Sequence, residues 1–285
     1  MQPWHAQLDL RFEQRGTTTV LAHNQHVGPL RVQKALYPES HDVCHAVLVH
    51  PPAGVAAGDQ LNINIALGKN AHALITTPGA TQWYKGQQNQ PARMHTHMQL
   101  AAGAKLDFLP QENILFDASH AQLHTTVDLD EGASAIGWEL CVLGRRASGE
   151  TWQNASLLQH THITVGGRGL WLEHSQIDSD STACKSSVAL AEHSAMGTLW
   201  AVGSAFNGTA GTEFAQNYAE TLPYTPSLKA GVSFVRSNDA GSGVLLLRVL
   251  GQNSEAVRAC LVAAWLHLRP TVHSVAGVPL RIWAV

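Results

Sequence analysis

Two pairs of histidines, each pair separated by one residue, are the first residues whose spacing suggests chemistry. They are the His-Thr-His segments at residues 95–97 and 160–162, and both stand in strand-like stretches. In a strand, residues i and i+2 point to the same face, so each pair offers two imidazoles to one metal ion. A cupin-like, metal-dependent β-barrel enzyme would add a glutamate a few residues later, but Glu173 is the nearest glutamate after the second pair. Solvated histidines on an exposed face are therefore the favoured interpretation, and the enzyme is the alternative.

A second group of possible metal ligands precedes the double proline at residues 51–52. It consists of His41, Cys44, His45 and His50. Neutral imidazole and thiolate are suitable ligands for nickel, copper or zinc. A free cysteine is more often a small buried core residue. Cys44, His45 and His50 are thus a candidate metal site that competes with a purely structural interpretation.

Four carboxylates stand isolated in otherwise apolar segments. They are Asp59, Glu112, Glu139 and Glu173. If such a group is buried, it needs a hydrogen-bonding partner, an arginine or water. One interpretation is therefore an exposed position or an ion pair. The other is a hydrated path, because weak oxygen ligands hold a cation lightly enough to release it.

Motifs of several common enzyme classes are absent from the sequence. It contains no GxxxxGK[ST], no GxSxG and no HExxH, so a P-loop, a nucleophile elbow and a zincin site are excluded. The four cysteines form no CxxC pair, which argues against a disulfide framework and a zinc knuckle.

The composition indicates a lightly charged chain without a bias toward polyanions. Lys and Arg number 18, Asp and Glu number 21, and the net charge is −3, so neither nucleic acid nor an anionic membrane is an expected partner. Charged residues are 14%, against about 25% in typical globular proteins, which predicts that another protein covers part of the surface. A polar N-terminus and the lack of a long apolar stretch predict a cytoplasmic protein.

Short alternating strands, separated by Gly, Asp and Asn, occupy roughly residues 1–205 and predict a mainly β sandwich, barrel or solenoid-like stack. The expected strands are residues 8–12, 17–22, 46–49, 61–67, 73–77, 94–100, 105–109, 122–129, 134–142, 157–165 and 170–177. Three segments also share a pattern of strand, glycine turn and small-residue strand, which suggests stacked layers of related geometry. They are residues 65–74, 100–109 and 129–138.

Residues 206–285 have a mixed α/β pattern. The expected elements are a short helix at 212–220 and strands at 231–236 and 244–250 around a turn at 238–241. A longer helix begins with Ser254 as its N-cap and ends at Pro270. No linker is visible, so we expect one domain, residues 1–285, with a small C-terminal helical elaboration.

Five ordered motifs and a tail carry a resemblance that spans almost the whole chain. They are VGPLRVQ (27–33) with YPE (37–39); CH (44–45) with HPPAGV (50–55) and GD (58–59); TTPGAT (76–81); LPQE (109–112) with FD (116–117); GWEL (137–140) with LGR (143–145) and GE (149–150); and Trp265, LRP (268–270) and RIW (281–283). Together they resemble the UreD family of urease accessory proteins, called UreH in some bacteria.

The resemblance implies a fold of stacked, β-helix-like sheets with a helical part. It also implies a non-enzymatic maturation factor that binds the urease apoprotein, together with a UreF-type accessory protein and a UreG-type GTPase. Nickel would be in transit, with no tightly bound cofactor, and homodimerisation within the complex is left open. A pure binding module without any passage is a further alternative.

The resemblance and the apolar flanks together suggest which residues line a hydrated passage for nickel. The candidates are Asp59, Thr81, Glu139 and Glu173. The C-terminal helix and tail are candidates for contact with the UreF-type partner, although such a helix often packs on its own sheet instead. The residues concerned are Trp265, Arg269 and Trp283.

Overall fold

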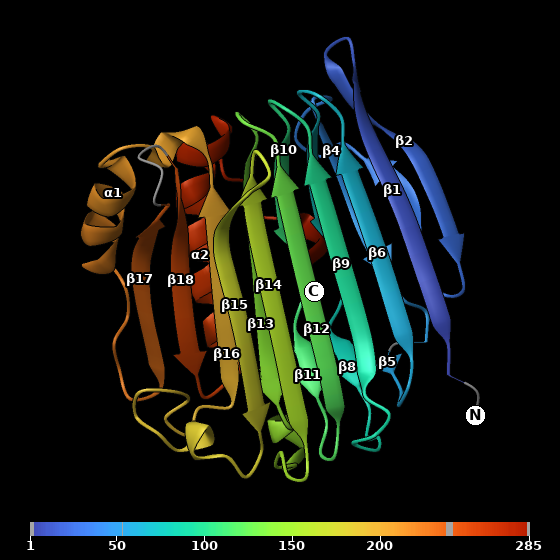
Figure 1. Ribbon diagram of the computed structural model, residues 1–285, viewed down its shortest axis with the longest axis vertical. Coiled ribbons are helices and arrows are strands. Elements are labelled where there is room, and N and C mark those ends of the chain that lie inside the picture. The colour runs from blue at the N-terminus through green and yellow to red at the C-terminus, as the bar shows by residue number, and fades with distance from the viewer. Residues whose placement is uncertain (1–2, 53, 238–241, 284–285) are drawn as a thin grey trace.

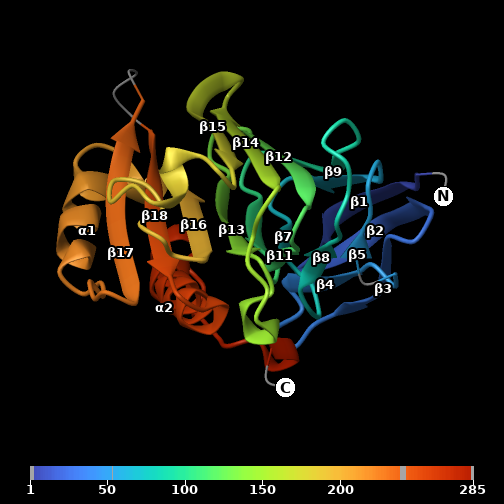
Figure 2. The same cartoon turned by 90° about the horizontal axis from the view of Figure 1, so that it is seen from below.

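Two β-sheets packed face to face form the body of the protein, and a helix covers the outer face of one of them (Figure 1) (Figure 2). The computed structural model describes residues 3–52, 54–237 and 242–283. The predicted turn at 238–241 therefore lies outside the described residues. Among the helices of the described part of the chain, none has both the length and the apolar character needed to cross a bilayer.

Sheet A has seven strands in the order β15-β14-β12-β9-β6-β1-β2. Its strands are β1 (His5–Arg15), β2 (Thr18–Val27), β6 (Gln60–Leu67), β9 (Ala92–Leu100), β12 (His120–Leu129), β14 (Ser156–Val165) and β15 (Arg168–Asp178). Strands β1, β6, β9, β12 and β14 run parallel to one another. The two edge strands, β2 and β15, pair antiparallel with β1 and β14.

Sheet B has eleven strands, eight of them in the continuous order β17-β18-β16-β13-β10-β7-β4-β3. These eight are β3 (Arg31–Leu36), β4 (Val43–Val49), β7 (His72–Thr76), β10 (Lys105–Leu109), β13 (Ser134–Leu143), β16 (Ala195–Val202), β17 (Leu228–Arg236) and β18 (Gly243–Gly251). Three short strands branch from this path: β5 (Gly54–Val55), β8 (Thr81–Trp83) and β11 (Asn113–Leu115). Because β18 pairs with β16, the C-terminal part extends the same sheet.

Successive coils of the chain run from sheet A to sheet B and back, which confirms the expected stacked, β-helix-like architecture. The three segments with a shared pattern are the turns β6–β7, β9–β10 and β12–β13. These turns stack: Lys105 N–H donates to the Ala71 carbonyl, and Ser134 N–H donates to the Ala104 carbonyl, each at 2.9 Å. Gly103 has φ +74°, and a Cβ there would come within 2.2 Å of the Asn70 side chain. The glycine is therefore required by both conformation and space.

Helix α2 (Ser254–His273) packs on the outer face of sheet B, and α1 (Ala210–Ala219), the short helix expected at 212–220, packs mainly against β17. Coverage on both faces explains why all five residues of β7 are buried. Two expectations about α2 are wrong. Its N-cap is Asn253, whose side chain accepts a 2.8 Å bond from Ala256 N–H, and the helix continues past Pro270 to His273. Polar contacts of Arg269 and His273 hold this last turn in place.

Candidate functional site

Three buried threonines form a polar row on the inner face of sheet A. Thr96, Thr125 and Thr161 are register partners on β9, β12 and β14, and each is 5% exposed. The row continues to Glu173 on β15, which pairs with Thr161. In a strand, neighbouring residues point to opposite faces, so the histidines beside these threonines point outward. The residues that face the interior are thus the threonines inside the His-Thr-His segments.

Glu139 on β13 lies opposite this row, on sheet B. Its Oε1 accepts a hydrogen bond from the Thr125 hydroxyl, and its Oε2 accepts one from Gln159 Nε2 at 2.9 Å. Burial raises the pKa of Glu139, and the nearby Glu173 raises it further, while the two donated hydrogen bonds act in the opposite direction. Glu139 is therefore a carboxyl group in a low-dielectric site that holds its proton more strongly than an exposed glutamate does.

Two cavities between the sheets share Glu139. The larger, about 530 Å³, has a polar lining that consists of Glu139, Gln159, Thr161, Glu173, Ser175, Gln176, Thr198 and Arg248. The smaller, about 250 Å³, has a polar lining that consists of His50, Thr77, Thr81, Thr96, Gln111, Asn113, His124, Thr125 and Glu139. Three of the four residues expected to line a passage therefore lie on these cavities, with Glu139 at the point that both have in common.

An ion pair forms part of the lining of the larger cavity. Glu173 Oε1 lies 2.7 Å from Arg248 Nη1, and the side chains are 23% and 52% exposed, respectively. The pair joins β15 of sheet A to β18 of sheet B. The charge of Glu173 is thus already balanced, and Arg248 places a positive charge at the solvent side of this cavity.

His50 lies on the smaller cavity together with Thr81. The Nδ1 atom of His50 is buried and has no hydrogen-bond partner among the described residues. Burial lowers the pKa of His50, while Asp59 has the opposite effect, so the neutral imidazole is favoured. A neutral ring nitrogen without a partner is a potential ligand for a passing cation.

Asp59 is near enough to His50 to act on its charge, but it is not among the residues that line the two cavities. Its Oδ1 accepts a 2.8 Å bond from Trp4 N–H, and its Oδ2 accepts a 2.9 Å bond from Ala56 N–H. Both oxygens are engaged by backbone amides, so the carboxylate holds the loop before β6. Glu112 is 3.6 Å from Arg258 Nε, as expected from the ion-pair interpretation.

The predicted metal site of Cys44, His45 and His50 is not formed. Cys44 and His45 are adjacent on β4 and therefore point to opposite faces. Cys44 is buried in the core between the sheets, and burial raises the pKa of its thiol. His45 Nε2 is 2.8 Å from Glu39 Oε1, on the other side of the sheet. Strand alternation thus separates ligands that look contiguous in the sequence.

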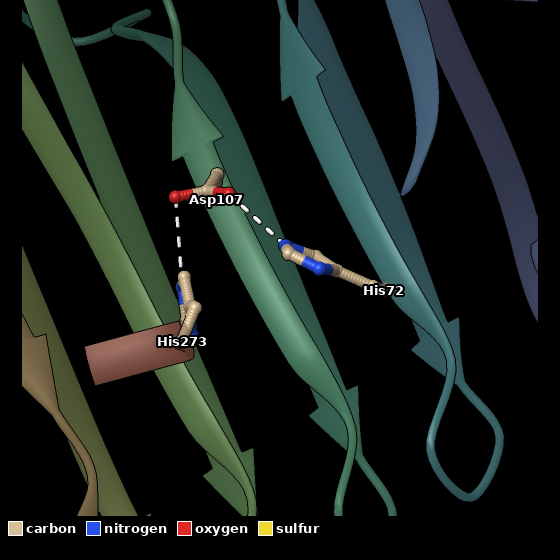
Figure 3. A group of neighbouring side chains, drawn as sticks. All are labelled: His72, Asp107 and His273. Carbon is tan, nitrogen blue, oxygen red and sulfur yellow. Dashed lines mark hydrogen bonds and ion pairs between the residues drawn. The ribbon is translucent and has the colours of Figure 1, made fainter. Parts of the chain in front are cut away.

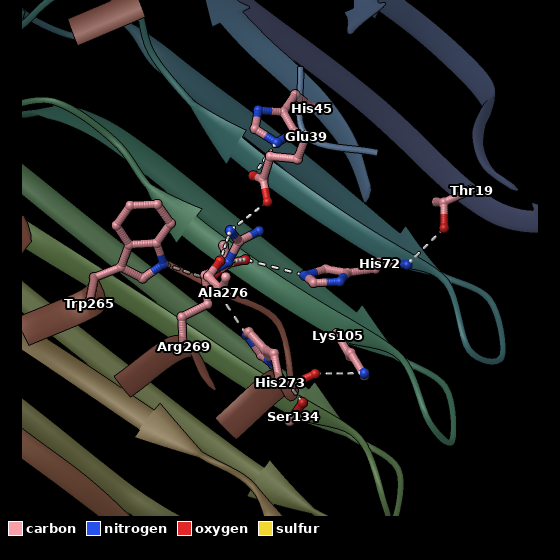
Figure 4. Close-up of polar contacts among 11 residues, drawn as sticks. Thr19, Glu39, His45, His72, Lys105, Ser134, Trp265, Arg269, His273 and Ala276 are labelled. Carbon is pink, nitrogen blue, oxygen red and sulfur yellow. Dashed lines mark hydrogen bonds and ion pairs between the residues drawn. The ribbon is translucent and has the colours of Figure 1, made fainter. Parts of the chain in front are cut away.

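The expectation that Trp265 and Arg269 contact a partner protein is also wrong, because both residues are 0% exposed on the inner face of α2. Figure 4 shows the polar network that holds them. Trp265 Nε1 and Arg269 Nε donate to Asp107 at 2.8 and 3.1 Å, and Arg269 Nη1 donates to Glu39 at 2.6 Å. Trp283 is only partly buried and donates a 3.1 Å bond to Thr76.

The same network contains a compact His-Asp-His group (Figure 3). His72 Nε2 and His273 Nε2 lie 3.2 and 3.5 Å from Asp107, and the three ligand atoms lie within 4.8 Å of one another. Burial alone would raise the pKa of Asp107, but the two histidines and Arg269 hold it well below its usual range. Because the Arg269 guanidinium already neutralises this carboxylate, the group fits a structural ion network better than a metal site.

Comparison with known proteins identifies the family. A model of the UreD urease accessory protein family matches residues 5–284. The chain belongs to the UreD family. The urease accessory protein UreD of Cupriavidus necator is 48% identical over 281 residues, which cover 99% of this chain and 94% of that protein. The UreD of Ralstonia nicotianae is 49% identical over 282 residues, with the same coverage. The UreD of Bordetella pertussis is 36% identical over 285 residues, covering 100% of this chain and 98% of that protein.

The family match confirms the resemblance found from the sequence motifs. It covers both the strand-rich part and the C-terminal part of the chain, so the cavities, Glu139 and α2 all lie within the UreD-family region.

Proposed function

We propose that this protein is a non-catalytic urease maturation factor that carries nickel through the polar space between its two sheets. Membership of the UreD family of urease accessory proteins supports the link to urease. The observation that carries the proposal is the position of Glu139, which lines both inter-sheet cavities opposite a row of threonines.

The residues that line the two cavities are better suited to passing a nickel ion on than to holding it tightly. Hydroxyl, amide and carboxyl oxygens are harder and weaker ligands for Ni²⁺ than thiolates or clustered imidazoles. A hydrated ion would exchange contacts with Thr81, Thr125 and Glu139 in turn. Its positive charge would favour the ionised form of Glu139, whose proton would leave to water. The nickel ion can dissociate from each ligand again because each interaction is weak.

The arrangement at the larger cavity gives the passage an electrostatic control. Arg248 repels a cation at the solvent side, and its pairing with Glu173 weakens the attraction of that carboxylate for a cation. An ion that passes Glu139 therefore meets a neutralised pair, which attracts it less than a free carboxylate would.

A protein that passes nickel through its interior requires other proteins that deliver the ion to the passage and receive it at the other end. We propose the urease apoprotein, a UreF-type accessory protein and, through the complex, a UreG-type GTPase, in the cytoplasm. Homodimerisation within that complex is compatible with the fold. A cupin-like enzyme gains no support, because each His-Thr-His pair lies on the outer face of an open sheet rather than in a barrel.

The proposal is tested by expressing variants with the urease operon and measuring nickel per urease alongside recovery of the complex. Glu139→Leu removes the shared carboxyl and fills space, so nickel per urease should fall while the complex still assembles. Glu131→Leu, at a 67% exposed glutamate, is the matched control and should behave as wild type. Normal nickel content with Glu139→Leu would reject the passage, and loss of the complex with both variants would point to a docking role alone.

A further inference from the structure

Four histidines form a row on the outer face of sheet A. His95, His124, His160 and His174 come from the neighbouring strands β9, β12, β14 and β15 and are register partners. His95 and His174 are exposed, and the two between them are partly buried. Figure 1 shows these four strands side by side, with no described helix in front of them. The row is therefore open to solvent along its length.

The spacing within the row matches the spacing of imidazoles that share a metal ion. Ring centroids are 4.5 Å apart for His95 and His124, 5.8 Å for His124 and His160, and 5.9 Å for His160 and His174. With metal–nitrogen distances of about 2.0–2.1 Å, two imidazoles on one ion have centroids about 4.5–6.3 Å apart. All three neighbouring pairs thus lie within this range. The rings of His95 and His124 are stacked with an interplanar angle of 4°, and the other two pairs are tilted by 54° and 74°, so sharing an ion requires the rings to rotate.

Neighbouring groups add an oxygen ligand and one opposing charge. His97 Nε2 lies 2.8 Å from Asp128 Oδ2 on the same face, beside the row. The charge of Arg93 acts on His95 and His124, and its Nε donates to Gln122 Oε1 at 2.9 Å. A cation would therefore bind more favourably toward His160 and His174 than at the His95 end.

We propose that this histidine row is a surface binding site for a first-row divalent transition metal ion, held by neighbouring imidazoles. Imidazole suits nickel, copper and zinc. The site is distinct from the proposed passage, because His95, His160 and His174 are not among the residues that line the smaller cavity, and the buried threonines next to the row histidines face the interior.

The test is calorimetric titration of the purified full-length chain with NiCl₂ at pH 7.5. The double variant His124→Gln/His160→Gln removes the two inner rings and leaves His95 and His174 with no row imidazole on a neighbouring strand, so the affinity should fall about tenfold or more. The control His23→Gln/His26→Gln removes two exposed histidines of β2, in the same sheet, and should bind as wild type. Equal affinity in wild type and the row variant, or equal loss in the control, would overturn the proposal.

A second measurement guards against a misfolded variant and separates this site from the passage. The single variants His95→Gln and His174→Gln change only exposed rings, and each should weaken binding in a chain with an unchanged unfolding transition. Bound Cu²⁺ should show at least two nitrogen ligands by electron paramagnetic resonance in wild type and one or none in the double variant. Glu139→Gln should leave this binding intact, so a failure of the passage and a failure of the histidine row give different results.

Discussion

The hydroxyl of Thr125, on sheet A, donates a hydrogen bond to the carboxyl group of Glu139, on sheet B. The two residues belong to different layers of the sandwich, and the bond crosses the space that holds both cavities. A polar bridge in this position links the two sheets and orients the carboxyl group that both cavities share.

Replacing Thr125 with valine removes the hydroxyl and keeps the branched shape. We expect the free energy of unfolding to fall by about 1–3 kcal/mol, because Glu139 loses one donor in a buried site. Nickel per urease should fall as well, since Glu139 is no longer oriented. Chemical denaturation and metal analysis measure the two effects. Thr126→Val, at the next, outward position, is the control, and an equal effect of both variants would contradict this role.

The raised pKa of Glu139 predicts a particular pH dependence of stability. A carboxyl group whose folded pKa lies above the unfolded value of about 4.3 contributes stability at low pH and loses it as pH rises through the folded value. Glu139→Gln has no such proton to lose. The stability of the variant relative to wild type should therefore increase as pH rises from about 4.3, as measured by urea denaturation across a pH series. A difference independent of pH would mean that Glu139 titrates as an exposed glutamate.

Removing the positive charge at the larger cavity should speed nickel transfer. Arg248→Gln takes away a cation that repels the ion and frees Glu173 to attract it, whereas Glu173→Gln leaves Arg248 unbalanced. We expect faster initial urease activation in the first variant and slower activation in the second. Stability should change by no more than about 1 kcal/mol in either, because the pair is partly exposed. Identical activation rates in both variants would exclude electrostatic control by this pair.

The buried network under α2 should behave as a structural element. Asp107→Asn removes the charge that balances Arg269, and breaking such a buried pair costs about 3–5 kcal/mol at neutral pH. Because the pKa of Asp107 is lowered in the folded state, its contribution is present above about pH 4 and is lost as the pH falls further. Thermal unfolding of Asp107→Asn and of the exposed control Asp130→Asn, at pH 7 and at low pH, tests both statements. A melting temperature of Asp107→Asn equal to that of wild type at pH 7 would contradict this structural role.

Alternation of apolar and polar residues was enough to predict most strands of the two sheets, but β3 and β16 were missed. The ordered motifs were enough to predict the family. The inward position of Thr96 also had a signal in the sequence, because Met94 and Met98 have the same parity along the strand. The histidines on either side point to the outer face, and because the chemical interpretation concentrated on them, it left Thr96 out. For Glu139, family position and apolar flanks pointed to a residue that lines both cavities.

Other features depend on contacts between distant parts of the chain. Asp107 and Arg269 are 162 residues apart, and no local pattern shows that Arg269 turns inward to meet Asp107. The short strands β5, β8 and β11 were missed because two or three residues are too few to show an alternating pattern. The amides that occupy both oxygens of Asp59 come from the N-terminal segment and from its own loop, so its structural role appears only after folding.

The most direct test of the enclosed route measures nickel transfer from the purified maturation complex to urease. The assay contains an excess of a chelator that is too large to enter the space between the sheets. If the ion travels between the sheets past Glu139, wild-type complex should fill urease in the presence of the chelator, and Glu139→Leu complex should not. Complete loss of transfer with wild type under chelator, or equal transfer by the variant, would contradict the account.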